Sequence, residues 1–240
     1  ENGKKKEEMN FKDEQLEGKW ITYYESGNIQ TETDYKDGKM EKQILYYENG
    51  LIQSETNLKG GELDGKYIGW YENGKKRGEA FFKDGEEDDK STEYYENGQL
   101  KEEPSFTKGI LDGIWIESFK DGEGFTQREY NNGKPDGRWI TWHDSTFVKA
   151  QEMTFIDSLL EGTYSEWWYD ERQKVLGYYI HDKKDSLWTY WDKFDHERFE
   201  EYDMGVLIAS YGWEYYDNGQ LKEEIIYQDG KMHGEWFSYY

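Results

Sequence analysis

The sequence predicts an all-β protein: an elongated, single-layer, twisted antiparallel meander of about ten β-hairpin repeats of ~24 residues. Three observations lead to this prediction. A glycine-marked turn returns at a fixed period, a second turn divides each period, and hydrophobic side chains alternate between the turns. We expect one repeat domain over residues 1–240, regular over 1–142, degenerate over 143–210 and regular again over 211–240.

The first turn of each repeat carries Asn-Gly or a close variant, and its glycine sets the repeat length. Successive glycines lie 24, 23, 24, 24 and 24 residues apart, and a gap of 97 residues, enough for four further repeats, precedes the last one. A fixed period of this size indicates a repeat architecture, in which each unit packs only on its neighbours. These glycines are Gly3, Gly27, Gly50, Gly74, Gly98, Gly122 and Gly219.

A second turn follows 11 residues after the first and reads Lys-Asp-Gly in two repeats and Gln-Asp-Gly in a third. Asn-Gly and Asp-Gly pairs favour type I′ hairpin turns, because both central residues of that turn take a positive φ. We therefore expect two antiparallel strands per repeat, joined by type I′ turns at both edges of the sheet. The second-turn glycines are Gly38, Gly61, Gly85, Gly109, Gly133 and Gly230.

Between the turns, large hydrophobic side chains occupy alternating positions, as expected for β-strands. A ring or a Leu lies eight residues after the first turn, for example Tyr35 and Phe82, and the other strand supplies runs such as WITYY at 20–24. The longer strand often holds an extra glycine, such as Gly65 in DGKY, which predicts a β-bulge. Pro104 cannot donate a ladder hydrogen bond, so we expect the fifth repeat to be irregular.

Charge and composition restrict the classes of partner. The net charge is −23, from 53 acidic and 30 basic residues, so nucleic acid and anionic lipid would be repelled and a basic partner attracted. An acidic surface that serves only solubility is the alternative. Aromatic residues make up 18% of the chain, which argues against disorder. The absence of cysteine excludes disulfides and thiolate metal sites.

No motif in the sequence points to catalysis, to a cofactor or to a metal ion. The four histidines lie in different repeats at dissimilar positions. Neighbouring glutamates such as Glu102 and Glu103 point to opposite faces of a strand, so they do not form an acid–base pair. The acidic run GEEDDK at 85–90 lacks the alternating ligand spacing of a calcium loop. The sequence therefore predicts a protein that is not an enzyme and holds no cofactor.

No apolar run is long enough for a membrane span, and no signal peptide is present. The chain opens as ENGKKKEE, without Met and partway through a repeat, so we expect a missing upstream segment and favour an exported or cell-envelope location over a cytoplasmic one. Both ends look cut within a repeat, and open sheet edges favour edge-to-edge pairing with another copy.

The unit YYENGQLKEEPSFTKGILDGIWIESF at 94–119 resembles the MORN repeat variant found in many bacterial proteins. The resemblance rests on the spaced pattern of Tyr-Tyr, Glu-Asn-Gly, Leu-Lys-Glu-Glu, an aromatic residue, Asp-Gly and Trp, and it is clear over residues 1–142 and 211–240. It implies antiparallel hairpins in an elongated sheet and no fixed chemistry. Some bacterial relatives are named as antitoxins or immunity-like partners of toxins, and others are exported or surface proteins.

Residues 143–210 depart from the repeat pattern, because other sequences replace the Asn-Gly turns there. Six of the eleven tryptophans lie between residues 139 and 191, and aromatic residues are enriched at binding hot spots. We predict that this stretch carries the partner-binding surface; the alternative is that the rings fill a tighter curl of the sheet. The candidate binding residues are Trp139, Trp142, Trp167, Trp168, Trp188 and Trp191.

The predicted function is that of a non-enzymatic protein–protein interaction module. In its narrower form it is an antitoxin-like or immunity-like inhibitor that binds a basic partner, with charge steering the encounter and buried rings supplying affinity. Two alternatives stay open. One is a structural or cell-surface repeat protein whose length is its function, and the other is a carbohydrate-binding protein, because exposed Trp and Tyr flanked by acids suit sugar rings.

Overall fold

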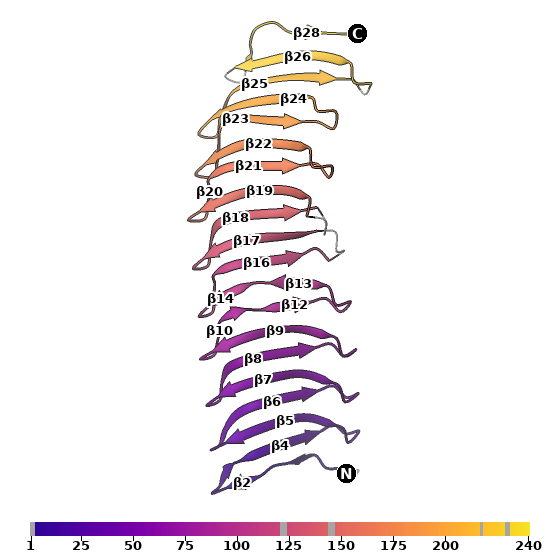
Figure 1. Ribbon diagram of the computed structural model, residues 1–240, viewed down its shortest axis with the longest axis vertical. Helices are drawn as coiled ribbons and strands as arrows, with labels where there is room; N and C mark the ends of the chain where they lie inside the picture. The colour runs from indigo at the N-terminus through magenta and orange to yellow at the C-terminus, as the bar shows by residue number, and fades with distance from the viewer. Residues whose placement is uncertain (1–2, 121–123, 144–146, 217, 229–230) are drawn as a thin grey trace. The chain divides into compact units, whose positions relative to one another are not determined.

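The computed structural model describes residues 3–120, 124–143, 147–216, 218–228 and 231–240; the predicted turn glycines Gly122 and Gly230 lie outside these residues. Within the described residues the protein is all-β and has no helix, and its strands run as antiparallel meanders (Figure 1). The fold class predicted from the sequence is confirmed. The chain divides into two compact units, residues 1–120 and 121–240. The expectation of a single repeat domain stays a prediction.

The first unit is an open sheet in which successive main strands pair with each other, except that residues 86–87 and residues 92–94 both pair with the strand at 76–83. Its main strands are β1 (Glu7–Glu8), β4 (Gly18–Tyr23), β5 (Ile29–Lys36), β6 (Lys39–Tyr46), β7 (Ile52–Lys59), β8 (Glu62–Trp70), β9 (Lys76–Lys83), β10 (Glu86–Glu87), β12 (Thr92–Tyr94), β13 (Leu100–Glu103) and β16 (Gly113–Ser118). Short strands form two side ladders: β2 (Phe11–Lys12) with β3 (Gln15–Leu16), and β11 (Asp89–Lys90) with β14 (Ser105–Thr107) and β15 (Ile110–Leu111).

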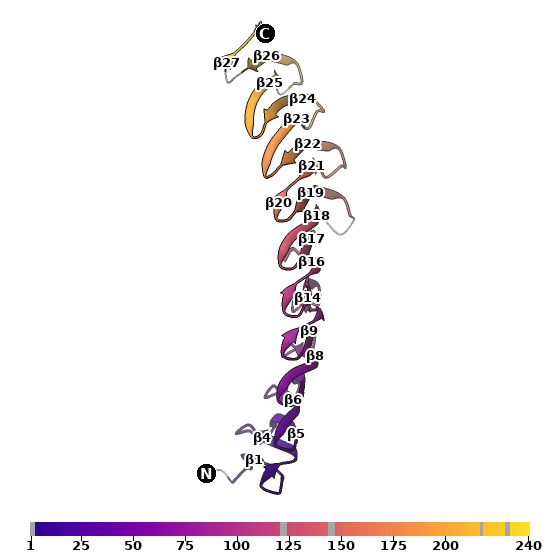
Figure 2. The same cartoon turned by 90° about the vertical axis from the view of Figure 1, so that its left-hand side faces the viewer.

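The second unit repeats this meander and includes the degenerate stretch 143–210, where β21 pairs with β22 and β23 with β24 as regular hairpins. Seen from the side, its strands bend along their length (Figure 2). Its strands are β17 (Phe125–Asn131), β18 (Lys134–Trp142), β19 (Lys149–Ile156), β20 (Leu159–Leu160), β21 (Gly162–Trp167), β22 (Gln173–Ile180), β23 (Lys183–Trp191), β24 (Glu197–Asp203), β25 (Val206–Tyr215), β26 (Leu221–Gln228), β27 (Lys231–Met232) and β28 (Phe237–Ser238).

The Lys-Asp-Gly turns have the type I′ geometry that the sequence predicts. In the turn between β5 and β6, Asp37 and Gly38 both have a positive φ, of 49° and 75°. The same holds for the turn between β9 and β10, where Asp84 has φ 50° and Gly85 has φ 86°. Tight two-residue connections of this kind match the twist of the strands that they join.

The prediction of type I′ geometry is wrong for the Asn-Gly turns. Only the glycine has a positive φ there, as Gly50 does at 85°. The loop is longer: Gly50 N donates to the carbonyl of Tyr47 at 2.9 Å, and Tyr47 N donates to the carbonyl of Leu51 at 2.8 Å. The Asn49 side chain accepts a hydrogen bond from Leu51 N at 2.9 Å, a local turn that fixes the preceding residues without a second positive φ.

The strand irregularities follow the sequence. At Gly65, which has φ 100°, the pairing of β7 with β8 shifts register between Thr56 and Leu58, so the predicted bulge is confirmed. Pro104 interrupts the fifth repeat between β13 and β14, as expected for a residue without a backbone donor. β14 then leaves the main sheet and pairs with β11 and β15.

The two faces of each sheet differ in chemistry. One face, here called the ring face, carries one position per repeat that usually holds an aromatic side chain; we call this series the ring column. In the first unit, cross-strand pairing places Trp20 opposite Thr33 and Tyr67 opposite Ala80, so small buried residues lie beside the rings. The ring column comprises Trp20, Gln43, Tyr67, Ser91 and Trp115 in the first unit, and Trp139, Tyr164, Trp188 and Trp213 in the second.

The opposite face of the first unit carries a regular series of ion pairs. Each joins a basic residue to the Glu 13 residues later on the neighbouring strand. Individual exposed pairs of this kind contribute little stability. Their regular spacing nevertheless shows that part of the large acidic charge is neutralised within the sheet. The pairs are Lys19–Glu32 at 2.6 Å, Lys42–Glu55 at 2.6 Å, Lys66–Glu79 at 2.5 Å and Lys90–Glu103 at 2.7 Å.

The tyrosine that begins each of several regular first turns connects one repeat to the next. The Tyr47 hydroxyl donates to the carbonyl of Trp70 at 2.8 Å, across 23 residues of sequence. Because this bond joins equivalent points of successive Asn-Gly turns, it fixes the spacing of the repeats. The equivalent bonds are Tyr24 to Tyr46 at 2.6 Å, Tyr71 to Tyr94 at 2.6 Å, Tyr95 to Ser118 at 3.2 Å and, in the second unit, Tyr216 to Tyr239 at 2.8 Å.

Candidate functional site

Three consecutive turns of the second unit stand where the regular repeats have Asn-Gly turns; we call 143–148, 168–172 and 192–196 the degenerate turns. The turn at 168–172 keeps the regular geometry, because Glu171 N donates to the Trp168 carbonyl at 3.0 Å and Trp168 N donates to the Arg172 carbonyl at 2.8 Å. The turn sequence is therefore changed, but the hairpin itself is preserved.

In each degenerate turn a residue other than Gly has a left-handed backbone, among the residues that the structure describes. Phe147, Glu171 and Asp195 occupy these positions with φ of 65°, 66° and 64°. For a residue with a Cβ, this conformation costs about 1–2 kcal/mol of conformational free energy. Backbone strain repeated in neighbouring turns is a reason to look for a function there.

Each degenerate turn exposes an aromatic ring. Phe147 is 69% exposed, Tyr169 62% and Phe194 49%. The regular turns carry Glu and Asn in this part of the hairpin, so the exposed surface changes from polar to aromatic along this edge of the unit. A hollow of about 340 Å³ lies beside the first two degenerate turns, and it is lined by Phe147, Val148, Lys149, Trp167 and Glu171.

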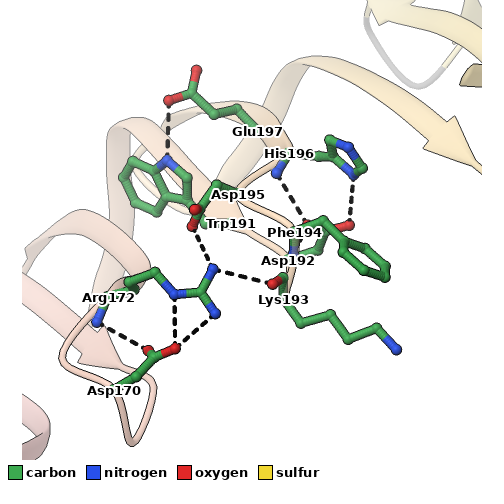
Figure 3. Close-up of polar contacts among 9 residues, drawn as sticks. All are labelled: Asp170, Arg172, Trp191, Asp192, Lys193, Phe194, Asp195, His196 and Glu197. Carbon is green, nitrogen blue, oxygen red and sulfur yellow. Dashed lines mark hydrogen bonds and ion pairs between the residues drawn. The ribbon is translucent and has the colours of Figure 1, made fainter. Parts of the chain in front are cut away.

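Arg172 connects the second and third degenerate turns (Figure 3). Its Nη1 donates to Asp195 Oδ1 at 3.0 Å and to the Lys193 carbonyl at 3.1 Å, while its Nε donates to Asp170 Oδ2 at 2.8 Å. The hydrogen bond from Arg172 holds the pKa of the Asp170 carboxyl below its usual value. This ionic link takes the place of the tyrosine hydroxyl bond between regular repeats, because Trp168 stands at the tyrosine position.

Asp192 shapes the third degenerate turn (Figure 3). Its Oδ1 accepts hydrogen bonds from Phe194 N at 2.7 Å and from His196 N at 3.0 Å, and its Oδ2 lies 2.9 Å from His196 Nδ1. Partial burial would raise the pKa of Asp192, but the two amide donors and His196 together lower it. The His196 ring stacks on Tyr215 with 3.4 Å between ring centres, and the half-exposed Phe194 ring lies 5.8 Å from the His196 ring.

The six predicted tryptophans do not lie on one surface. Trp188 is 1% exposed and Trp142 9%, so both are buried, whereas the other four are partly exposed. Trp139 and Trp188 belong to the ring column. Trp167, Trp168 and Trp191 lie directly beside the degenerate turns. The role of the six tryptophans in binding stays a prediction.

Trp191 has one polar contact near the third degenerate turn: its Nε1 donates to Glu197 Oε1 at 3.0 Å (Figure 3). Trp167 and Trp168 each lie near a lysine, with Lys149 Nζ 5.7 Å from the Trp167 ring centre and Lys174 Nζ 5.2 Å from the Trp168 ring centre. Cations at this distance are attracted by the negative face of the ring.

Sequence reasoning missed a polar cluster around Trp188. Glu200 Oε2 accepts hydrogen bonds from the hydroxyls of Tyr190 at 2.7 Å and Tyr202 at 2.9 Å. Burial would raise the pKa of Glu200, but these two hydroxyls and the nearby cations lower it overall. Lys184 Nζ lies 4.2 Å from the Trp188 ring centre, and burial lowers the pKa of this lysine. The alternation of residues along the two strands could have indicated this cluster. It places Trp188 and Glu200 on the same face, and the two residues pair directly across β23 and β24.

The described part of the chain contains no group of three or more His, Asp or Glu side chains placed to hold a metal ion. It also contains no helix with the length and hydrophobicity needed to cross a membrane.

Four segments of the chain match the family model of the MORN repeat variant: residues 16–37, 63–84, 90–106 and 214–229. The family resemblance seen in the sequence is therefore confirmed. None of the matched segments overlaps residues 143–210, in which the degenerate turns lie. Comparison with curated proteins found no match. Repeats of this family are non-catalytic modules that generally bind proteins or membranes.

Proposed function

We propose that this chain, which carries repeats of the MORN variant, is a non-enzymatic module that binds another protein through the degenerate turns of its second unit. The observation that carries the proposal is the exposed ring on each of three consecutive turns: Phe147, Tyr169 and Phe194. The turn tips of most regular repeats carry Glu and Asn instead, so a series of exposed rings at the tips of three consecutive turns is a feature of the degenerate stretch.

Aromatic side chains on rigid hairpins are well suited to supply binding energy, because they bury a large area and lose little conformational entropy. The half-buried Trp167, Trp168 and Trp191 enlarge the apolar surface behind the exposed rings. Arg172 and Asp195 provide a polar rim, and their mutual ion pair at 3.0 Å keeps the second and third turns in register.

The partner of this proposal is a basic protein. The net charge of −23 steers such a partner toward the chain, and the rings then determine the lifetime of the complex. In the narrower form of the proposal the complex is inhibitory: the chain occludes the active surface of a basic toxin domain, as an antitoxin or immunity protein does. The inhibitory form of the proposal is supported by the net charge and by the family resemblance. It would be tested by measuring whether the chain abolishes the partner's activity.

The test is affinity capture from the native organism with the purified chain as bait, eluted with rising salt. We expect one basic protein to elute as salt screens the attraction. Recovery of nothing, or only of further copies of the chain, would count against a protein partner and favour a structural role.

The captured protein then permits a direct test of the surface. The double variant Tyr169→Ser, Phe194→Ser should bind it at least about tenfold more weakly, because losing two hot-spot rings costs more than 1.4 kcal/mol. The matched control is Phe11→Ser, Phe81→Ser, which removes two exposed rings from the first unit instead. Equal binding by both double variants would show that the degenerate turns are not the binding surface.

A further inference from the structure

The ring column of the first unit has a gap at Ser91. This residue lies 24 positions after Tyr67 and 24 before Trp115, at the place where a ring is expected. The local backbone confirms the alignment, because Asp89 has φ 87° and stands where Gly65 and Gly113 form the bulge in the neighbouring repeats. The small Ser91 side chain therefore leaves the space of one ring between two aromatic neighbours.

A cavity of about 520 Å³ occupies this place on the ring face of the first unit, and Ser91 is part of its lining. A pocket of this size falls in the range of small-molecule sites, which are mostly apolar with a few convergent polar groups. The strand break at Pro104 contributes to the cavity, because β14 turns away from the main sheet beside it. The apolar walls are Tyr67, Phe82, Pro104, Phe106, Leu111 and Trp115.

The polar lining of the cavity is predominantly acidic. The acidic residues Glu87, Glu93 and Glu102 and one cation, Arg77, line it, whereas the Glu79 carboxylate is paired with Lys66 on the opposite face. Arg77 is engaged by the cavity wall, since its Nη2 donates to the Tyr67 hydroxyl at 2.9 Å.

Glu93 and Glu102 face each other across β12 and β13 at this site. Lys101 pairs closely with Glu93 and lies 3.5 Å from Glu102 Oε1. Burial, and then the hydrogen bond with Glu93, raise the pKa of Glu102. Lys101, with a smaller contribution from Arg77, compensates Glu93, but the pKa of Glu102 stays raised, so a further cation placed between the aromatic walls would be stabilised beside it.

We propose that this cavity binds a small aromatic amine, with its ring in the gap between Tyr67 and Trp115 and its ammonium group directed at Glu93 and Glu102. The aromatic walls attract the ring by stacking and the cation through their negative faces, while the carboxylates select the positive charge. The site lies in the first unit and does not involve the degenerate turns of the second. The proposal can therefore be tested independently of the proposed protein binding.

The experiment is a calorimetric titration of the full chain with tryptamine, compared with 3-methylindole, which lacks the amine, and with indole-3-propionate, which carries a negative charge. Tryptamine should bind, and the two analogues should bind at least about tenfold more weakly, as expected when a charge-assisted hydrogen bond is lost. No binding of tryptamine at millimolar concentration, or equal binding of all three compounds, would overturn the proposal.

Two variants locate the site. Ser91→Trp restores the residue type found elsewhere in the ring column, so it should fill the gap and abolish tryptamine binding, whereas the matched control Ser91→Ala should retain it. Glu102→Gln should weaken tryptamine binding about tenfold and leave 3-methylindole binding unchanged. Circular dichroism establishes that each variant is folded. Unchanged tryptamine binding by a folded Ser91→Trp variant, or by Glu102→Gln if the first does not fold, would refute the assignment.

Discussion

Replacing Tyr47 by Phe removes one hydrogen bond between successive repeats and leaves the ring in place. The lost bond joins the Tyr47 hydroxyl to the carbonyl of Trp70 at 2.8 Å. Phe is sterically acceptable at this position of the repeat, because the chain itself carries Phe119 there. The change therefore isolates the contribution of the hydroxyl from that of the ring.

The expected cost follows from the number of bonds removed. A single intramolecular hydrogen bond contributes about 0.5–1.5 kcal/mol to the free energy of unfolding. Tyr71 and Tyr95 make the equivalent bonds in the next two repeats. Successive bonds lie roughly 10 Å apart, two strand spacings, so their contributions should add. The triple Tyr→Phe variant should lose about 3 kcal/mol.

The assay is urea unfolding of the full chain, followed by circular dichroism and by tryptophan fluorescence. Because stability in a repeat array is a sum of repeat and interface contributions, the triple variant should also unfold less cooperatively. The control is Tyr35→Phe, which removes a hydroxyl for which the described residues show no hydrogen bond. A triple variant with the same midpoint as this control would refute the view that these hydroxyls couple the repeats.

Three further predictions concern the second unit. Gly177→Ala should destabilise it by about 1–3 kcal/mol and shift tryptophan emission to the red, because the new Cβ would lie 2.2 Å from a Trp188 ring atom; an unchanged melting temperature would contradict the packing. The contribution of Glu200 to stability is fully present above the ordinary glutamate pKa of 4.5 and is lost as pH falls through its lowered folded-state value. Glu200→Gln should therefore be less stable at neutral pH and less sensitive to acid, and parallel stability–pH curves would argue otherwise. Arg172→Gln should accelerate hydrogen exchange at the Phe194 amide. An unaltered exchange rate would show that the third degenerate turn does not depend on Arg172 for its stability.

Much of the fold could be predicted because its signals are local and repeated. The Lys-Asp-Gly turns, the bulge at Gly65 and the break at Pro104 each follow from the backbone preference of one or two residues. The Asn-Gly turns were assigned the wrong type because Asn-Gly is compatible with both a two-residue and a longer loop. The register of the flanking strands decides between them, and that register depends on contacts such as the one from Tyr47 to the next repeat.

The candidate site was less predictable, because burial depends on which face of a strand a residue occupies. Counting tryptophans grouped the buried Trp188 with the half-exposed Trp191, although they lie on opposite faces of the same strand, three positions apart. The exposed rings Tyr169 and Phe194 were missed, since nothing in the local sequence distinguishes a turn aromatic from a strand aromatic. Alignment of the repeats could have shown the gap at Ser91, but only the structure shows that a cavity lies there.

The meander has a mechanical consequence for each unit. Each main strand is bonded to the strands beside it, so tension applied along the direction in which the strands stack loads one ladder at a time. Such a unit would yield by peeling, hairpin after hairpin, instead of breaking as a whole. Each released repeat of 24 residues would add roughly 80 Å of extended chain. A protein built in this way lengthens in even steps under low force, and it can shorten again by re-forming one hairpin on the edge of the last.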